Sequence, residues 1–245
     1  MQKLHKLRDS GLARFAVERG FQRKNRRELF GFRDGLRNPD RHDRTKIAFI
    51  DRGTAPHEPA WTGGGSYLVY LKIKQNFDSF DGLSEPQQED VLGRKLDETG
   101  TRLDKPLGTD PRTEGLFVDP AIPPPASHVR KAGPRLDAAH DAVRIFRRGV
   151  PYSEVDNNRE ISAGLQFVSF QWSTDLFNTI YRRWIFNPSF PPGSSGNDAL
   201  LDRCLIHIQK GGLFFIPPGH ADEGFIGSGV FEMQKPPKRS RKAKW

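Results

Sequence analysis

Two runs that alternate apolar and polar side chains constrain the fold of this sequence more than any other feature. Residues 63–74 read G-G-G-S-Y-L-V-Y-L-K-I-K and residues 164–172 read G-L-Q-F-V-S-F-Q-W, and each predicts a half-buried strand. Residues 212–216, G-L-F-F-I, predict another strand, which Pro-Pro-Gly closes. Helical patterns are expected at residues 84–96, 175–185 and 198–206, with Ser84 as an N-cap, while residues 138–148 suit either a strand or a helix.

This order of elements predicts an α+β fold. Strand, helix, strand followed by strand, helix, strand is the split β-α-β pattern, a ferredoxin-like antiparallel sheet with helices on one face. One complete unit fits within residues 61–233. Residues 1–60, with a helix expected at 1–18, form an attachment, and residues 97–127 are expected to be a long loop. Residues 234–245 are expected to be a basic, disordered tail.

Charge and composition exclude several classes of protein. Residues 1–46 carry a net charge of +8 and residues 234–245 carry +6, so the total of +9 leaves residues 47–233 at −5. The basic tail can touch nucleic acid or an anionic surface, or be a solvated end, but no aromatic and basic strand motif predicts a specific nucleic-acid partner. A single cysteine, Cys204, excludes an intramolecular disulfide and a cysteine-based metal site.

The distribution of apolar residues bears on the location of the protein. No apolar run approaches the roughly 18 residues of a membrane span, so no membrane partner is expected. The N-terminus lacks the apolar stretch of a signal peptide, which predicts a cytoplasmic protein as the chain is written. The prediction becomes export if a missing N-terminal region carried a signal.

Residues 127–152 and a loop upstream of them hold the side chains best suited to ligand binding or catalysis. His128 follows a proline-rich loop, Arg147 and Arg148 lie farther along, and Asp34 stands between two glycines in G-F-R-D-G. A lone histidine suits a prosthetic group that brings its own ligands, such as a porphyrin, but from the residues alone a packed structural histidine is the favoured interpretation. Asp34 could equally close an Asx turn.

Residues 31–39, G-F-R-D-G-L-R-N-P, resemble the G-x-x-D-G motif of the dye-decolourising peroxidases, haem enzymes of the dimeric α+β barrel group. Further segments follow in that family's order: G-G-S-Y-L-V at 64–69, H-V-R-K with P-R at 128–135, R-R-G-V-P-Y at 147–152 and G-L to Q at 164–171. N-D-A-L at 197–200 and F-F-I-P-P-G at 214–219 also fit. The resemblance spans about residues 20–233. Within the family, the sequence is most similar to the branch that includes the deferrochelatase/peroxidase proteins.

The resemblance implies haem b as the cofactor and His128 as the proximal ligand of its iron. A carboxylate on the other ring nitrogen would make the imidazole more basic. Asp198 is the expected partner of His128, with Asp202 as the reserve.

The resemblance also implies the distal side of the haem. Asp34 would be the acid–base residue in cleavage of hydrogen peroxide, and Arg147 the cation that stabilises developing negative charge. Arg148, its neighbour, is the alternative to Arg147. Leu165 and Phe167 would line the haem.

The implied activity is a haem peroxidase that reduces hydrogen peroxide and oxidises dyes, phenolics or other small aromatic reductants, reached at the surface through Trp172, Tyr181 or Trp184. Only about thirty residues precede the G-x-x-D-G loop, where the family has a complete ferredoxin-like domain. The first domain is therefore expected to be truncated, with residues 1–60 as its remnant, or a second chain supplies the missing half; a homo-oligomer is a separate expectation. The alternatives are a non-catalytic ferredoxin-like module and a deferrochelatase-like release of iron from haem.

Overall fold

The computed structural model describes residues 17–51, 55, 57–96, 102–106, 123–155, 159–194, 196–219 and 225–232. Their main sheet comprises β1 (Ser66–Gln75), β4 (Phe146–Arg147), β5 (Val150–Val155), β6 (Ile161–Gln171) and β7 (Ile206–Ile216), and a separate ribbon comprises β2 (Arg94–Leu96) and β3 (Arg102–Pro106). The helices are α2 (Arg44–Ala48), α3 (Phe77–Asp81), α4 (Glu85–Leu92), α5 (His128–Ala132), α6 (Ala138–Ala142), α7 (Thr174–Asn178), α8 (Ala199–Asp202) and α9 (Gly229–Glu232). A 3-10 turn, η2 (Ala60–Thr62), and a π-helical segment, η3 (Thr179–Ile185), complete the set.

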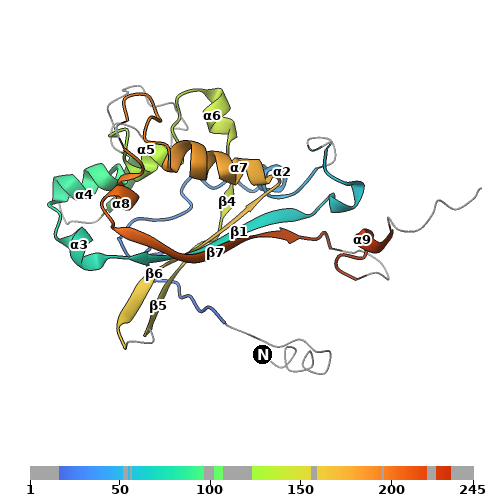
Figure 1. Cartoon of the computed structure of the whole chain (residues 1–245), viewed down its shortest axis with the longest axis horizontal. Coiled ribbons are helices and arrows are strands. Elements are labelled where there is room, and N and C mark those ends of the chain that lie inside the picture. The colour runs from blue at the N-terminus through green and yellow to red at the C-terminus, as the bar shows by residue number, and fades with distance from the viewer. Residues whose placement is uncertain are drawn as a thin grey trace, which may run out of the picture.

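The main sheet has the order expected of a ferredoxin-like unit. Its strands follow β4-β6-β1-β7, with β5 also paired to β6, and every pairing is antiparallel. Helices α4, α5, α7 and α8 lie on one side of this sheet (Figure 1). The predicted α+β class with an antiparallel sheet is confirmed.

The helices are held to the sheet by two apolar clusters. Phe30, Phe80, Val91, Leu92, Leu200 and Leu205 form the first, in which the rings of Phe30 and Phe80 stack with centroids 4.2 Å apart. Ile145, Ile180 and Trp184 form the second. Because the first cluster joins residue 30 to helices α3, α4 and α8, the segment before β1 is packed into the same core.

Helix α4 is shorter than its sequence pattern predicted. It begins after Ser84, whose N–H donates to the Gln87 side chain, as the N-cap prediction expected. It ends at Gly93, whose left-handed φ of +74° breaks the helix. A side chain at Gly93 would lie 2.7 Å from Ser127 Oγ, so this ending is set by close packing. The residues after Gly93 pair as β2 with β3, which lies in the segment predicted as loop.

Three further boundaries differ from prediction. The helix predicted at 198–206 is confined to α8, because Leu205 N–H returns to Leu200 O and β7 begins at Ile206, well before the predicted strand at 212–216. The helix predicted at 175–185 becomes α7 followed by the wider η3. The ambiguous stretch 138–148 holds both α6 and β4. Residues 1–16 of the first predicted helix and the tail at 234–245 lie outside the described residues.

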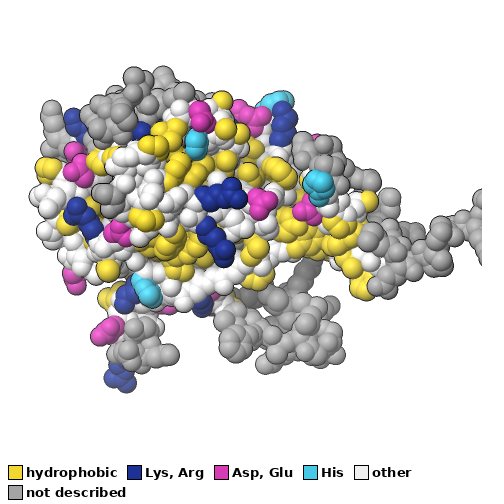
Figure 2. All heavy atoms as spheres, turned by 45° about the horizontal axis from the view of Figure 1, so that its top comes forward, with side chains coloured by type: hydrophobic (Ala, Val, Ile, Leu, Met, Phe, Trp, Pro, Cys, Tyr) yellow, Lys and Arg dark blue, Asp and Glu magenta, His cyan; other side chains and the backbone are white. Residues whose placement is uncertain are grey.

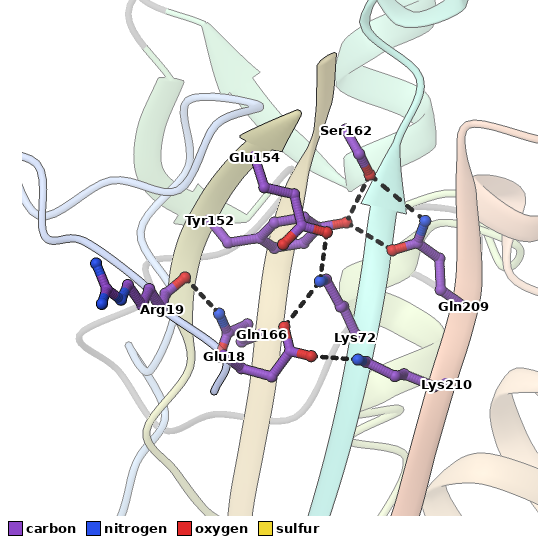
Figure 3. A network of polar contacts seen from close by, with 9 residues as sticks. All are labelled: Glu18, Arg19, Lys72, Tyr152, Glu154, Ser162, Gln166, Gln209 and Lys210. Carbon is purple, nitrogen blue, oxygen red and sulfur yellow. Dashed lines mark hydrogen bonds and ion pairs between the residues drawn. The ribbon is translucent and has the colours of Figure 1, made fainter. Parts of the chain in front are cut away.

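The sheet face away from the helices carries a polar network (Figure 3). Lys72 is buried there, and its Nζ lies 2.8 Å from Glu18 Oε2 and 2.5 Å from Glu154 Oε1. Its ammonium also lies 4.7 Å from the centre of the Tyr152 ring. Burial by itself lowers the pKa of Lys72, but the hydrogen bonds to the two carboxylates outweigh burial and raise it. The network fastens the segment around Glu18 across the strands.

None of the described helices combines the length and hydropathy that crossing a bilayer requires. Among the described residues, no three histidine, cysteine or acidic side chains are grouped as a metal-ion site.

Candidate functional site

Two adjoining cavities lie between the helices and the sheet, and they share one wall. Asp34, His128 and Arg147 stand on that shared wall, together with Phe32, Ala132, Ile145 and Ile180. Side chains that lie far apart in the sequence therefore meet in one place. The three groups singled out from the sequence are among them.

His128 is the first residue of α5, and the segment before it fixes its position. Ser127 has extended backbone and is the N-cap, and its N–H donates to Pro124 O at 2.8 Å. At the other end of α5, the buried Lys131 donates from Nζ to Asn187 O at 2.7 Å and also to Phe190 O. The helix carrying His128 is thus tied at both ends to neighbouring loops.

The His128 ring is paired with the carboxylate of Asp198. Nδ1 of His128 lies 2.6 Å from Oδ2 of Asp198, and Asp198 is 1% exposed. An ionised carboxylate can only accept, so the hydrogen bond places a proton on Nδ1, and in the neutral ring the lone pair is then on Nε2. Burial by itself lowers the pKa of His128, but the charge and hydrogen bond of Asp198 raise it above its ordinary value.

Asp198 is held in place by the start of α8. Its Oδ1 accepts the N–H of Leu200 at 2.9 Å, and the N–H of Ala199 donates to Ala126 O at 2.8 Å. The second bond joins the start of α8 to the residues just before His128. Asp202, the reserve candidate, is exposed and accepts the amide of Asn197 instead. Of the two candidates, Asp198 is the one that contacts the histidine.

Asp34 stands in a tight loop that turns it toward Arg147. Its Oδ1 accepts the N–H of Gly35 at 2.7 Å and lies 3.1 Å from Nε of Arg147. Gly35 has a left-handed φ of +83°, and a side chain there would lie 2.8 Å from Nδ2 of Asn38. The second glycine of the motif is therefore required by both conformation and space.

The side chain of Asn38 aligns Arg147 by making the two backbone hydrogen bonds that a neighbouring strand would make. Nδ2 of Asn38 donates to Arg147 O at 2.8 Å, and Arg147 N–H donates to Oδ1 of Asn38 at 2.8 Å. On the other side, Arg147 pairs with Ser169 of β6. Arg148 points elsewhere: it is exposed, with its guanidinium 5.8 Å from the centre of the Phe146 ring. Arg147 is thus the arginine that faces Asp34.

The Arg147 and Asp34 pair is an ion pair without a hydrogen bond at Nε. The two atoms are close, but the buried Nε makes no hydrogen bond with any described residue. A buried N–H donor without an acceptor is costly. This donor lies beside the cavity, where a bound molecule could accept from it.

A buried acid, Glu28, organises the loop before Asp34. Its carboxylate accepts from the N–H groups of Phe30 and Phe32 at 3.0 and 3.1 Å and from Nε2 of Gln75 at 2.6 Å. Burial raises the pKa of Glu28 to about 7, although these hydrogen bonds oppose the change. Oε1 of Gln75 makes no hydrogen bond with a described residue. Both side chains line the second cavity.

The two cavities differ in their remaining walls. The first is basic and is lined by Arg33, Arg37, Arg94, Arg135 and Arg144. The second is mostly apolar, and Leu165 and Phe167 line it together with Leu71, Ile73, Phe177 and Ile208. The lining of the first cavity therefore suits anionic groups, and that of the second suits an apolar group.

Three polar side chains and one wall of this site were not identified from the sequence. Glu28 and Gln75 looked like ordinary polar residues, because only tertiary packing buries them. Asn38 belongs to the quoted G-F-R-D-G-L-R-N-P motif, so its position was visible although its partner, Arg147, was not. The basic wall could not be foreseen, because its arginines come from several separate segments.

Comparisons with known proteins agree with this architecture. The model of the family "Dyp-type peroxidase, C-terminal" matches residues 25–221. Deferrochelatase from Escherichia coli O157:H7 is 31% identical over 216 residues, which are 84% of this chain and 46% of that protein. DtpA from Streptomyces lividans is 27% identical with a TM-score of 0.61, covering 89% of this chain and 55% of its own. A variant of Rhodococcus jostii DypB in complex with heme is 23% identical with a TM-score of 0.58, covering 81% and 54%.

The chain spans about half the length of the curated relatives it matches. The family model nevertheless covers most of the chain, including the loop with Asp34, the helix with His128 and the strand with Arg147. This chain therefore belongs to the Dyp-type peroxidase family and corresponds to its C-terminal part.

Proposed function

We propose that this chain binds haem b between His128 and the Asp34–Arg147 pair and reduces hydrogen peroxide at the expense of organic reductants. The observation that carries the proposal is one shared cavity wall with a histidine–aspartate dyad and a separate carboxylate–arginine pair. A metal-ligating histidine whose other nitrogen is bound by a carboxylate is a recurrent arrangement. Membership of a family of haem peroxidases and deferrochelatases supports the same assignment.

The residues present fit this cofactor. Nδ1 of His128 is occupied by Asp198, so Nε2 is the nitrogen left to bind iron. The apolar cavity with Leu165 and Phe167 suits a porphyrin ring, and the arginine-lined cavity suits its propionate groups. The unsatisfied donor at Nε of Arg147 gives an oxygen ligand a hydrogen-bond partner.

When bound, haem would supply the redox-active iron at which peroxide is reduced. Asp34 would take a proton from one peroxide oxygen and return it to the departing one, the two tasks of a single acid–base carboxylate. Arg147 would stabilise negative charge on that departing oxygen, because Asn38 and β6 hold its backbone in place before the reaction. Asp198 would keep His128 oriented and make it a stronger electron donor.

The test begins with haem reconstitution of the purified protein. We expect a Soret band in the wild type, its loss or displacement in His128→Ala, and no change in His207→Ala, which removes an exposed histidine from β7. Asp34→Asn should retain the band and lose about two to four orders of magnitude of peroxide turnover. A band that is identical in His128→Ala would refute His128 as the ligand.

A second candidate function is release of iron from haem. It is favoured by the 31% identity to proteins named deferrochelatase. Loss of iron leaves free protoporphyrin, which fluoresces, whereas peroxidase turnover consumes peroxide and reductant. Measuring both signals from one haem-loaded sample separates the two functions. A folded protein with no Soret band would instead support a non-catalytic ferredoxin-like module.

The aromatic residues expected to serve bulky reductants occupy different environments. Trp184 is 4% exposed and packs in the second apolar cluster, so the expectation that it meets a dye at the surface is wrong. Tyr181 lines the apolar cavity, and its ring centroid lies 4.7 Å from that of the exposed Phe186. Trp172 is half-buried, and its backbone N–H donates to Ile47 O. Tyr181 is therefore the strongest candidate of the three.

A further inference from the structure

Lys131 and Asp198 are a cation and an anion that lie inside the protein beside His128. Charged side chains are scattered over the surface, as Figure 2 shows for one face of the molecule. In contrast, Lys131 is 0% exposed and Asp198 is 1% exposed. An ionised group inside a protein loses its hydration, so it needs hydrogen bonds and a compensating charge. Asp198 pairs with His128, whereas the two carbonyl oxygens that Lys131 binds require a donor but not a charge.

A closed ring of contacts brings these two charges together. Lys131 follows His128 by one turn of α5, so the two side chains are neighbours on the helix. Nδ1 of His128 lies 2.6 Å from Oδ2 of Asp198. The N–H of Asp198 donates to Ile185 O at 2.9 Å, and Nζ of Lys131 donates to Asn187 O at 2.7 Å. Both charged residues are therefore attached to the same short stretch of chain as well as to His128 or its helix.

The electrostatics of Lys131 agree with this geometry. Burial lowers the pKa of Lys131, and the charges of Asp198 and Asp202 act in the opposite direction. Asp202 is exposed, so water and salt screen its charge, whereas Lys131 and Asp198 are both buried and their interaction is screened much less. The main counter-charge of Lys131 is thus the carboxylate that binds His128.

The charge of Asp198 bears on how strongly His128 can donate electrons. A carboxylate that accepts from one ring nitrogen draws that proton toward itself and makes the other nitrogen a stronger donor. A cation beside the carboxylate offsets part of its negative charge and weakens this effect. Lys131 would therefore limit the donor strength that Asp198 confers, while it reduces the free-energy cost of burying the carboxylate.

We propose that Lys131 tunes the electron donation of His128 by partly neutralising Asp198. This role rests on the proposed haem binding, because donor strength matters only to a bound iron. Lys131 acts through Asp198, which makes it a positioning residue and not a catalytic one. A merely structural role, in which Nζ only holds the loop with Asn187 and Phe190, predicts different results in the tests below.

The first test is a double-mutant cycle in the haem-free full chain. Urea unfolding followed by circular dichroism is measured for the wild type, Lys131→Met, Asp198→Asn and the double variant. Lys131→Met should lower the urea midpoint of the wild type, and should lower it by about half as much or less in the Asp198→Asn background, where the ammonium has lost its counter-charge. Equal shifts in both backgrounds would overturn the proposal and leave Lys131 as a tether of the loop.

The second test is the reduction potential of the haem-loaded protein. Removing a nearby positive charge favours the ferric state, so the ratio of ferric to ferrous haem at a fixed potential should rise about tenfold in Lys131→Met, a fall of about 59 mV for one electron. The same substitution should shift the ratio clearly less in the Asp198→Asn background. An unchanged potential in Lys131→Met would overturn the proposal. So would equal shifts in both backgrounds, because Lys131 would then act on the iron directly.

Further variants separate the charge of Lys131 from its hydrogen bonds. Lys131→Gln keeps an N–H donor for the carbonyl oxygens and loses the charge, so it should lower the potential as Lys131→Met does. It also serves if Lys131→Met does not fold. Lys131→Arg keeps the charge and should leave the potential close to that of the wild type. The opposite pattern, a shift in Lys131→Arg and none in Lys131→Gln, would assign Lys131 a structural role only.

Lys72 provides a matched control. It is a second buried lysine, 4% exposed, but it lies on the sheet face away from the helices, where it pairs with Glu18 and Glu154 (Figure 3). Lys72→Met should therefore lower the urea midpoint equally in the wild-type and Asp198→Asn backgrounds and leave the potential unchanged.

The two tests also separate this role from the proposed function. A missing Soret band would overturn the proposed haem binding, and with it the tuning of an iron ligand, even if the haem-free cycle shows that Lys131 and Asp198 interact. A normal Soret band with additive effects in the cycle would overturn the role of Lys131 alone.

Discussion

Replacing the buried acid Glu28 by glutamine should change how the stability of this protein depends on pH. Burial raises the pKa of Glu28 from the ordinary 4.5 to about 7. Each unit of such a change corresponds to about 1.36 kcal/mol, so Glu28 alone makes the folded state about 3 kcal/mol less stable when it is ionised. Because the group is almost wholly buried, solvent screening does not reduce this figure appreciably.

The direction follows from proton binding. Between pH 4.5 and about 7 the folded protein holds a proton on Glu28 that the unfolded chain has released. The stabilising effect of that proton is complete below pH 4.5 and is lost as the pH rises through the folded pKa. Glu28→Gln is neutral at every pH and nearly the same shape, so it removes this dependence.

Urea unfolding followed by circular dichroism would measure the effect. The free energy of unfolding of the wild type, minus that of Glu28→Gln, should fall by about 3 kcal/mol between about pH 4.5 and about pH 8. Taking the difference cancels the other titrating groups. Glu85→Gln, which alters an exposed carboxylate at the start of α4, should show almost no such change. A stability difference for Glu28→Gln that is constant with pH would show that burial does not raise the pKa of Glu28.

Further substitutions test the packing and the dyad. Phe80→Ala should lower the free energy of unfolding by about 3–5 kcal/mol, because the ring is 2% exposed and stacks on Phe30, whereas the half-exposed Phe214→Ala should cost far less in the same assay. Gly164→Ala should lower the free energy of unfolding by roughly 1–3 kcal/mol or prevent folding, because a side chain there would lie 2.0 Å from the carbonyl oxygen of Ile73 across the β1–β6 ladder. A thermal unfolding curve like that of the wild type would contradict this strand register. Asp198→Asn should weaken haem affinity about 10–100-fold in a haem titration, whereas the control Asp202→Asn should leave it unchanged. Equal haem affinities of the two variants would contradict the role of Asp198 as the partner of His128.

The strands and the class of fold were accessible from the sequence because their causes are local. Alternating side chains at 63–74 and 164–172 mark the two central strands, β1 and β6, to within a few residues. Ser84 was recognisable as an N-cap because capping involves only the next turn of helix. The order of these elements then left the ferredoxin-like sheet as the simplest arrangement, and the quoted motifs led to the family.

Other boundaries were decided by contacts between distant segments. The end of α4 at Gly93 depends on Ser127 lying against it, which no local pattern reports. Glycine usually weakens strands, yet β7 continues through Gly211. Glycine is required at this position because a side chain there would lie 2.5 Å from Leu71 of the neighbouring strand. The prediction of a helix at 198–206 failed for the same reason: pairing with β1 fixes the backbone from Ile206 onward.

The candidate site shows the same division between residue types and their geometry. His128, Asp34 and Arg147 could be named from motifs, because motifs record residue types at short spacing. The resemblance already ranked Asp198 before Asp202, but the contact with His128 exists only because α8 lies beside α5, which joins residues 70 positions apart. It likewise ranked Arg147 before Arg148, and the pairing of β4 with β6 accounts for their different directions, since neighbouring residues of a strand point to opposite faces. Local sequence thus determined which groups are available, and tertiary packing determined which of them meet.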